Sequence, residues 1–253
     1  MLRSKMSWDL RDKTVVITGG NIGIGYEIAD KYLEKCAKIV ILLGRNEDNG
    51  AKAFESLTEK YGNGKAVFFK CDVTSDLEEI YRKIIDTYQY VDVLINNAGV
   101  LNETEIRNTI NVNVTALIEW SFKFWEHMRK DKSGKGGTII NIASIYGYRV
   151  DQYVPVYQAS KFAVMGFTKS LGHIKSFNEF GVRVVAICPG FTETRLVADP
   201  KTVISDVGFK SFTKKQEWQT VDAVGNAAVE VFETADSGTA YLIEGAKLIE
   251  QVL

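Results

Sequence analysis

The chain has 253 residues, of which 45% are hydrophobic and 25% charged, and its formal net charge is −1. This composition can bury a large core, and the near-neutral charge excludes a general electrostatic attraction to nucleic acid or to acidic membranes. The longest apolar runs, such as 39–43 and 184–188, have the length of strands. Since a helix needs ~20 apolar residues to cross a bilayer, no membrane span is expected.

Cysteine and histidine usage restricts the compartment and the chemistry. Segment 1–10 carries charged side chains and lacks the apolar stretch of a secretory signal. The cysteines show no paired spacing, so they are expected to be small buried residues in a reducing compartment, which indicates a cytoplasmic protein. They are Cys36, Cys71 and Cys188. With only two histidines, a histidine-rich metal site is excluded and no metal is expected.

Strand and helix patterns alternate along the chain. In order, the sequence predicts strand 14–18, helix 25–36, strand 39–43, helix 46–61, strand 66–70, helix 77–88, strand 91–95, helix 107–130, strand 137–142, helix 156–177, strand 182–187, a looser segment 191–219, helix 221–233 and strand 240–243. Continuous apolar strands separated by helices indicate an α/β fold, a doubly wound Rossmann-type parallel sheet. No linker or repeat divides residues 1–253, so a single domain is expected.

A glycine-rich turn follows the first strand, with the sequence Thr18-Gly19-Gly20-Asn21-Ile22-Gly23-Ile24-Gly25. Glycines let the backbone turn tightly and approach a pyrophosphate, whose charge the following helix N-terminus stabilises. The spacing differs from G-x-G-x-x-G, and a simple tight turn is the alternative. The position between a strand and a helix favours nucleotide binding.

Tyr157 and Lys161 lie four residues apart in a predicted helix, on one face. A free tyrosine has a pKa of about 10, and a neighbouring ammonium favours the phenolate. Such a pair suits proton exchange with an alcohol or carbonyl oxygen, although an ordinary exposed Tyr/Lys pair has the same spacing.

These motifs, taken together, resemble those of the short-chain dehydrogenase/reductase family over nearly the whole chain. They occur in the family's order: Thr18-Gly19-x-x-x-Gly23-x-Gly25, Asp72-Val73, Asn96-Asn97-Ala98-Gly99, Asn113, Ser144, Tyr157-x-x-x-Lys161 and Pro189-Gly190-x-x-x-Thr194. Segments 91–100, 155–168 and 187–191 are similar to 15-hydroxyprostaglandin dehydrogenases and insect alcohol dehydrogenases. The family's usual Gly-Gly after the last strand is replaced by Gly245-Ala246.

The resemblance implies four catalytic residues. Tyr157 would exchange the proton with the substrate oxygen, and Lys161 would lower the pKa of Tyr157 and hold the ribose of the nicotinamide nucleotide. Ser144 would hydrogen-bond the substrate oxygen. Asn113 would hold a water that links Lys161 to solvent. A serine after a strand also often caps the next helix, and an asparagine in a helix is often exposed.

The resemblance also implies the cofactor-binding set. It consists of Gly19, Asn21, Ile22, Gly23, Ile24, Gly44, Arg45, Asp72, Val73, Asn97, Ala98, Gly99, Tyr157, Lys161, Pro189, Gly190, Thr192 and Thr194. Within this set, Asp72 and Val73 would frame the adenine, and Pro189, Gly190 and Thr194 would hold the carboxamide end.

The end of the second strand bears on the choice of cofactor. NAD-dependent relatives carry aspartate where this chain has Gly44, and Arg45 follows it. Without a carboxylate the 2′-phosphate is not repelled, and a guanidinium binds phosphate in fork geometry. NADP is therefore favoured. NAD remains the alternative, because the relatives that look nearest use NAD and because Glu47 and Asp48 are close. Positions 44 and 45 are both expected at the surface.

Apolar and aromatic side chains near the site and in the looser segment favour a lipophilic secondary alcohol or ketone, such as a terpenoid, fatty or steroid-like alcohol. They are Ile145, Tyr146, Tyr148, Tyr153, Val154, Phe191, Leu196, Val197, Phe209, Phe212 and Trp218. The basic residues Lys210, Lys214 and Lys215 are compatible with a substrate that carries a carboxylate or phosphate, which is the alternative. A homodimer or homotetramer is expected, because the helices 108–130 and 156–177 carry more apolar residues than one sheet face needs and because these helices pair with their copies in relatives. The apolar residues include Leu117, Phe122, Phe124, Trp125, Phe162, Met165 and Phe167. A catalytically silent dinucleotide-binding scaffold, or a lyase or epimerase on the same fold, is the alternative function.

Overall fold

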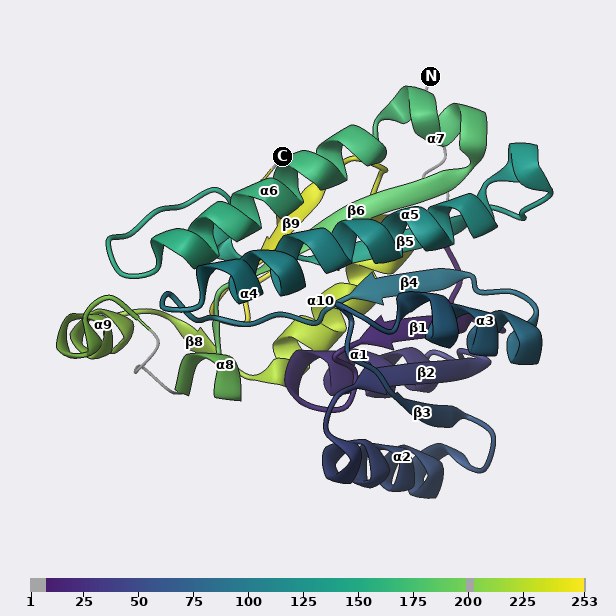
Figure 1. Ribbon diagram of the computed structural model, residues 1–253, viewed down its shortest axis with the longest axis horizontal. Coiled ribbons are helices and arrows are strands. Elements are labelled where there is room, and N and C mark those ends of the chain that lie inside the picture. The colour runs from purple at the N-terminus through teal and green to yellow at the C-terminus, as the bar shows by residue number, and fades with distance from the viewer. Residues whose placement is uncertain (1–7, 199–202, 253) are drawn as a thin grey trace.

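The computed structural model describes residues 8–198 and 203–252 and contains one large sheet (Figure 1). Its strands are β1 (Thr14–Thr18), β2 (Ile39–Gly44), β3 (Ala66–Lys70), β4 (Val93–Asn96), β5 (Gly137–Ile142), β6 (Val182–Pro189), β9 (Ala240–Ile243) and β10 (Glu250–Gln251). The strand order is β10-β9-β6-β5-β4-β1-β2-β3, and every neighbouring pair is parallel except β9 with β10. The predicted α/β Rossmann-type sheet is confirmed.

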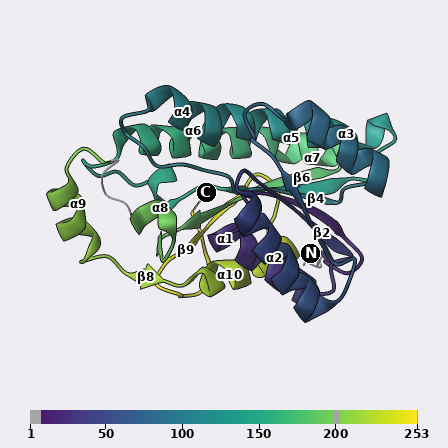
Figure 2. The ribbon, with the colours of Figure 1, turned by 60° about the horizontal axis from the view of Figure 1, so that its bottom comes forward.

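Helices cover both faces of the sheet, as Figure 2 shows most clearly. One face carries α1 (Gly23–Glu34), α2 (Glu47–Tyr61) and α10 (Val221–Thr234). The other carries α3 (Leu77–Tyr88), α5 (Leu117–Met128) and α6 (Pro155–Leu171). Because neighbouring side chains of a strand point to opposite faces, Val15 and Ile17 enter the first core and Val16 the second.

The predicted helix 107–130 contains a π-helical turn. It consists of α4 (Ile106–Ile110), the π-helical η1 (Asn111–Ala116) and α5, and a short helix η2 (Lys130–Lys132) follows. A π-helical turn inserts an extra residue and often marks a functional site, and periodicity cannot detect it. Asn113 lies inside this turn.

The predicted helix 156–177 is two helices. The helix α6 ends at Leu171 with Gly172 as its C-cap, and α7 (Ile174–Phe180) follows. A Cβ at Gly172 would lie 2.5 Å from Val184 O, so glycine lets this turn pack directly against β6. Strand β10 was not predicted. Cys71 and Cys188 are buried as expected, but Cys36 is exposed, because it follows α1 in a turn with φ 65°.

Segment 191–219 is less loose than predicted. It contains β7 (Phe191–Thr192), α8 (Arg195–Ala198), α9 (Asp206–Thr213) and β8 (Trp218–Gln219), and β7 pairs with β8. Its apolar side chains join a third hydrophobic cluster, separate from the two cores of the sheet. No helix among the described residues has the length and apolar character needed to cross a membrane.

Candidate active site

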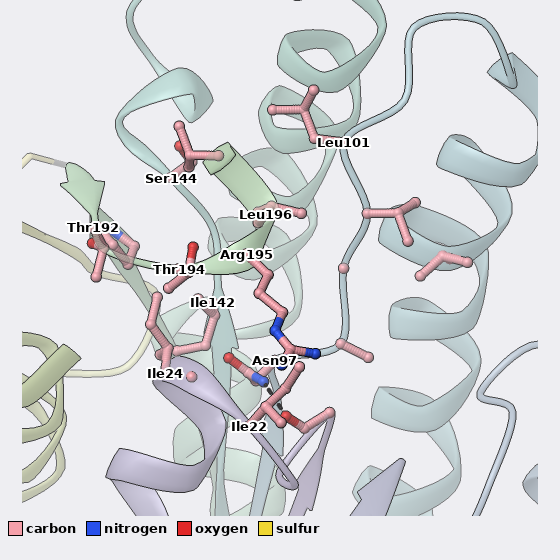
Figure 3. A pocket seen from close by; sticks show the side chains of 18 of the residues that line it. Ile22, Ile24, Asn97, Leu101, Ile142, Ser144, Thr192, Thr194, Arg195 and Leu196 are labelled. Carbon is pink, nitrogen blue, oxygen red and sulfur yellow. Dashed lines mark hydrogen bonds between the residues drawn. The ribbon is translucent and has the colours of Figure 1, made fainter. Parts of the chain in front are cut away.

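A cleft of about 1000 Å³ opens where the parallel strands end, on both sides of the point where the chain order reverses between β1 and β4. Ligands of doubly wound sheets bind at this place. In Figure 3, Ser144 and Leu101 lie at one end of the cleft and Ile22 and Asn97 at the other. The first end is the candidate substrate end, and the second leads to the glycine-rich turn.

The glycine-rich turn is tied to the loop that follows β4. Asn97 Nδ2 donates to Thr18 O at 3.1 Å and to Gly19 O at 2.9 Å, while Thr18 Oγ1 accepts from the main-chain nitrogens of Asn97 and Ala98. A Cβ at Gly25 would lie 2.5 Å from Asn97 Nδ2, so only glycine permits this approach. Asn97 therefore shapes the turn rather than only lining it.

Helix α6 brings Tyr157 and Lys161 together at the cleft. Both are buried, and Lys161 Nζ donates to Ile142 O at 2.8 Å and lies 5.5 Å from the centre of the Tyr157 ring. Burial raises the pKa of Tyr157 to about 12 and lowers that of Lys161 to about 8, because both charged forms lose solvation. The group that lowers the pKa of Tyr157 here is the hydroxyl of Ser144.

Ser144, just after β5, both caps a short helix and lines the cleft. Its Oγ accepts from Tyr146 N at 3.1 Å and so caps the short helix η3 (Ile145–Gly147), and the residue also lines the cleft. The capping bond uses a lone pair of the oxygen, so its proton is available for a group in the cleft. Capping and a place in the site are therefore compatible.

Asn113 does not line the cleft. Its Oδ1 accepts from Val100 N at 2.8 Å, and its Nδ2 donates to Val100 O at 2.8 Å and to Ser160 Oγ at 3.0 Å. The side chain thus fixes the loop after β4 against α6. Asn113 is the predicted catalytic residue whose side chain lies behind the site rather than in it.

Glu103 is a residue that sequence reasoning missed. Its carboxylate accepts from Val156 N at 2.8 Å and from Tyr157 N at 2.9 Å. Val154, the N-cap residue of α6, supplies no side-chain cap, so Glu103 satisfies main-chain donors that the first turn leaves free. A missing local cap at 154 is a weak signal, and the sequence does not say which distant residue replaces it.

At the far end of the cleft, Arg45 lies beside Asp72. Its Nη1 is 3.9 Å from Asp72 Oδ2, and the Arg45 side chain is 64% exposed. The pKa of Asp72 is lowered, first by hydrogen bonds from Thr74 and to a lesser degree by Arg45. Gly44 is buried under Asn21, so the expectation of a surface position is wrong for Gly44 and right for Arg45.

The substrate end is apolar, but only some of the predicted aromatic side chains reach it. The predicted residues Ile145, Tyr146, Phe191, Leu196, Val197 and Phe209 line the cleft, and so does Leu101, which the sequence did not single out. The other predicted residues pack behind them: Tyr153 lies 5.3 Å from Phe212 and Trp218 lies 5.5 Å from Phe191, between ring centres. Lys210, Lys214 and Lys215 are exposed and do not line the cleft.

Every predicted cofactor-binding residue lines this one cleft. These residues come from the turn 19–24, the end of β2, the segments 72–73 and 97–99, helix α6 and the segment 189–194. The side chain of Thr192 is buried and accepts from Gln219 Nε2, so its hydroxyl is already engaged. Lining residues that the motifs did not include are Asn46, Asn49, Cys71, Val100, Val112, Ile142, Ala143, Glu193 and Arg195.

The residues fit a dinucleotide. The first turn of α1 contains no acidic side chain, its N-cap Ile22 forms no side-chain cap, and the glycine-rich turn before it lines the cleft. An anion is stabilised at such a helix N-terminus. Among the described residues, no group of three or more His, Cys, Asp or Glu side chains is arranged to hold a metal ion.

Comparison with known proteins agrees with this geometry. Residues 13–202 match the family model described as short chain dehydrogenase. Human 15-hydroxyprostaglandin dehydrogenase [NAD(+)] is 36% identical over 187 residues, which cover 73% of this chain and 70% of that protein. Alcohol dehydrogenase 1 of Ceratitis cosyra is 33% identical over 236 residues and covers 91% of both chains.

A solved structure described as an NAD(P)-dependent gluconate 5-dehydrogenase of Beutenbergia cavernae with bound NADP has a similar fold. It superposes with a TM-score of 0.80 at 26% identity, over 94% of this chain and 97% of that chain. The cleft with its Tyr157–Lys161 pair, the family model and these relatives lead to one conclusion. The chain belongs to the short-chain dehydrogenase family and is a dehydrogenase that acts on a CH–OH group with NAD(P).

Proposed function

We propose that this enzyme interconverts a lipophilic secondary alcohol, of terpenoid, fatty or steroid-like type, and its carbonyl product. The observation that carries the proposal is the meeting of Tyr157, Lys161 and Ser144 at a cleft whose adjoining wall is apolar. Leu101, Ile145, Phe191 and other apolar side chains form that wall, and the lysines of α9 and its C-terminal end do not reach it. The relatives named above are a prostaglandin dehydrogenase and an alcohol dehydrogenase.

We propose that Tyr157 is the proton-transfer group. In alcohol oxidation its phenolate takes the proton of the substrate hydroxyl, and in carbonyl reduction its hydroxyl returns the proton. Ser144 donates to the substrate oxygen and stabilises charge that develops there. NAD(P), when bound, accepts or supplies the hydride.

Lys161 and Asn113 are assigned supporting roles. The ammonium of Lys161 has one donor committed to Ile142 O, which leaves donors for the nicotinamide ribose. For Asn113 we propose the water-mediated link between Lys161 and solvent. Since its Nδ2 donors are used by Val100 and Ser160, the acceptors left for the water are its main-chain carbonyl and a lone pair of Oδ1.

NADP is the proposed preferred cofactor. The support is the absence of a carboxylate at Gly44 and the presence of Arg45 in the lining of the cleft. We propose further that Asp72 and Val73 frame the adenine and that Pro189, Gly190 and Thr194 hold the carboxamide end. We also infer a cytoplasmic location, from three free cysteines without a disulfide among the described residues.

The test is a screen of alcohols and ketones with each cofactor, followed through the absorbance of the reduced nicotinamide. With a substrate in hand, Tyr157→Phe should abolish turnover and leave the cofactor Kd unchanged, because only the proton-transfer group is lost. Lys161→Ala should lose activity and also bind the cofactor more weakly. A Tyr157→Phe enzyme that kept more than roughly a tenth of the wild-type kcat would overturn the assignment of Tyr157.

A further inference from the structure

Arg195 is a cation in the cleft that no family motif includes. It is the first residue of α8, directly after Thr194, and its exposed side chain lines the cleft. In Figure 3 the guanidinium extends away from α8, across the cleft, toward Ile22 and Asn97. Arg195 therefore reaches from the substrate segment to the glycine-rich turn on the opposite wall.

Arg195 forms no ion pair with a carboxylate of the described residues, although Glu193 also lines the cleft. Within the described part of the chain, no Asp or Glu oxygen lies within ion-pair distance of its guanidinium. By contrast, Arg45 lies 3.9 Å from Asp72, and Arg149 lies 2.9 Å from Glu244. Lys161, which also lines the cleft, donates to Ile142 O. Arg195 is thus a guanidinium at a cavity wall that has no ion-pair partner among residues 8–198 and 203–252.

The opposite wall is also suited to an anion. The start of α1 has neither an acidic residue in its first turn nor a side-chain cap. A Cβ at Gly23 would lie 3.7 Å from Thr194 Cγ2, so the residue before Arg195 lies next to the start of α1. A guanidinium and a helix N-terminus that face the same space both favour negative charge there.

We propose that Arg195 binds the pyrophosphate of the dinucleotide, so that the phosphates lie between its guanidinium and the N-terminus of α1. This inference rests on the proposed use of NAD(P). It gives the two arginines of the cleft different tasks. Arg45 contacts a group that only NADP carries, whereas Arg195 contacts a group common to NAD and NADP.

The experiment is calorimetric titration of NAD, NADP and ADP-ribose into the wild type and into Arg195→Met, Arg195→Lys and Arg45→Met. Methionine keeps much of the aliphatic length and removes the charge. We expect Arg195→Met to raise the Kd of all three ligands by a similar factor, roughly tenfold, and to reduce the salt dependence of binding. Arg195→Lys should recover part of the affinity, because lysine restores the positive charge but not the planar pair of donors of the guanidinium.

Arg45→Met is the matched control, since it removes a cleft arginine but should weaken NADP alone. If Arg195→Met binds all three ligands like the wild type, with an unchanged Tm, the inference is wrong while the proposed function stands. A change confined to the KM of the alcohol would equally overturn it and place Arg195 with the substrate. If the wild type itself binds neither NAD nor NADP, the proposed function fails instead.

Discussion

A Cβ atom built on Gly44 would lie 2.4 Å from Oδ1 of Asn21. Asn21 is 7% exposed, and its Nδ2 donates to Asn46 O at 3.3 Å, so the glycine-rich turn and the end of β2 are packed directly against each other. The position at which NAD-dependent relatives carry aspartate is therefore filled by a side chain from the turn. Residues 21 and 44 form a pair that has to change together.

This contact predicts the outcome of changing the cofactor preference. Gly44→Asp alone should lower the free energy of unfolding by about 1–3 kcal/mol, because it overpacks Asn21. Asn21→Ala combined with Gly44→Asp should recover stability and improve NAD binding, since the carboxylate accepts from the ribose hydroxyls and repels the 2′-phosphate. Tm and the Kd of both cofactors check this, with Asn21→Ala as the control. A stable single variant with improved NAD binding would show that Asn21 does not block the position.

Arg45 gives a separate test of the preference for NADP. Arg45→Ala removes a charge-assisted contact to the 2′-phosphate, and because the side chain is 64% exposed we expect a loss of roughly tenfold in NADP affinity. NAD affinity should hardly change, and it serves as the internal control. If the wild type already prefers NAD by a wide margin, the Arg45 assignment is wrong, and Glu47, Asp48 or a main-chain group would bind the ribose hydroxyls.

The buried ammonium of Lys161 should make stability depend on pH. Its pKa is lowered to about 8 from an ordinary 10.5, so between these values the unfolded chain holds more protons and the stability contributed by this site rises with pH. The variant Lys161→Met has no such group, so its stability should lack this increase with pH. Its free energy of unfolding, relative to the wild type, should therefore fall as pH increases from about 7 to 9.5.

Chemical denaturation at both pH values measures this difference, and the exposed Lys169 of the same helix supplies the control Lys169→Met. The cost of leaving Ile142 O without its donor is independent of pH, so it cancels in the comparison. A Lys161→Met difference that is constant with pH would mean that the ammonium is not desolvated.

Glu103 should position the catalytic helix. Glu103→Ala leaves the main-chain nitrogens of Val156 and Tyr157 without their acceptor, which should cost about 1–2 kcal/mol of stability. Because these are the residues that set the place of the phenol, kcat should fall more than the cofactor Kd rises. Glu103→Gln keeps a single acceptor oxygen, so its stability and its kcat should lie between those of the wild type and Glu103→Ala.

Glu105→Ala is the matched control for Glu103, because the exposed carboxylate of Glu105 accepts a hydrogen bond from Asn108 Nδ2 at 3.2 Å, one turn along α4, and not from the catalytic helix. It should leave kcat and Tm near the wild-type values. If Glu103→Ala lowers Tm and leaves kcat unchanged, Glu103 is only a helix cap.

Helices α5 and α6 carry the predicted subunit interface. Phe122 and Phe162 are 46% and 44% exposed, and Phe122 lies 5.7 Å from Phe167 between ring centres. We expect a two-fold dimer with a self-complementary contact, which Phe162→Asp should dissociate to 28.3 kDa monomers. Sedimentation measures the mass, and Phe54→Asp, at an exposed position of α2, should have no effect. A monomeric wild type at micromolar concentration would contradict the dimer.

Some of the apolar residues predicted for the interface pack inside the chain instead. The sequence indicated Leu117, Phe124 and Met165 as surplus apolar residues, yet these are buried within their own chain. Strand periodicity and the glycine-rich turn are local patterns, so the order of elements and the cleft lining followed from the sequence. The contacts of Glu103 join residues 53 positions apart, and local patterns carry no information about such partners. The burial of Gly44 and the direction of Arg195 were missed for the same reason.

The third hydrophobic cluster has a consequence for how this enzyme can acquire new substrates. Tyr157 packs edge-on against Tyr146, Tyr146 against Phe191 and Phe191 against Phe212, so the catalytic phenol belongs to the same small core as the walls of the cavity. Substitutions that enlarge the cavity will therefore alter the packing of the phenol as well. Laboratory evolution directed at the lining residues Val197 or Phe209 should therefore change substrate selectivity and reactivity together, and variants that accept bulkier alcohols should need compensating changes next to Tyr146.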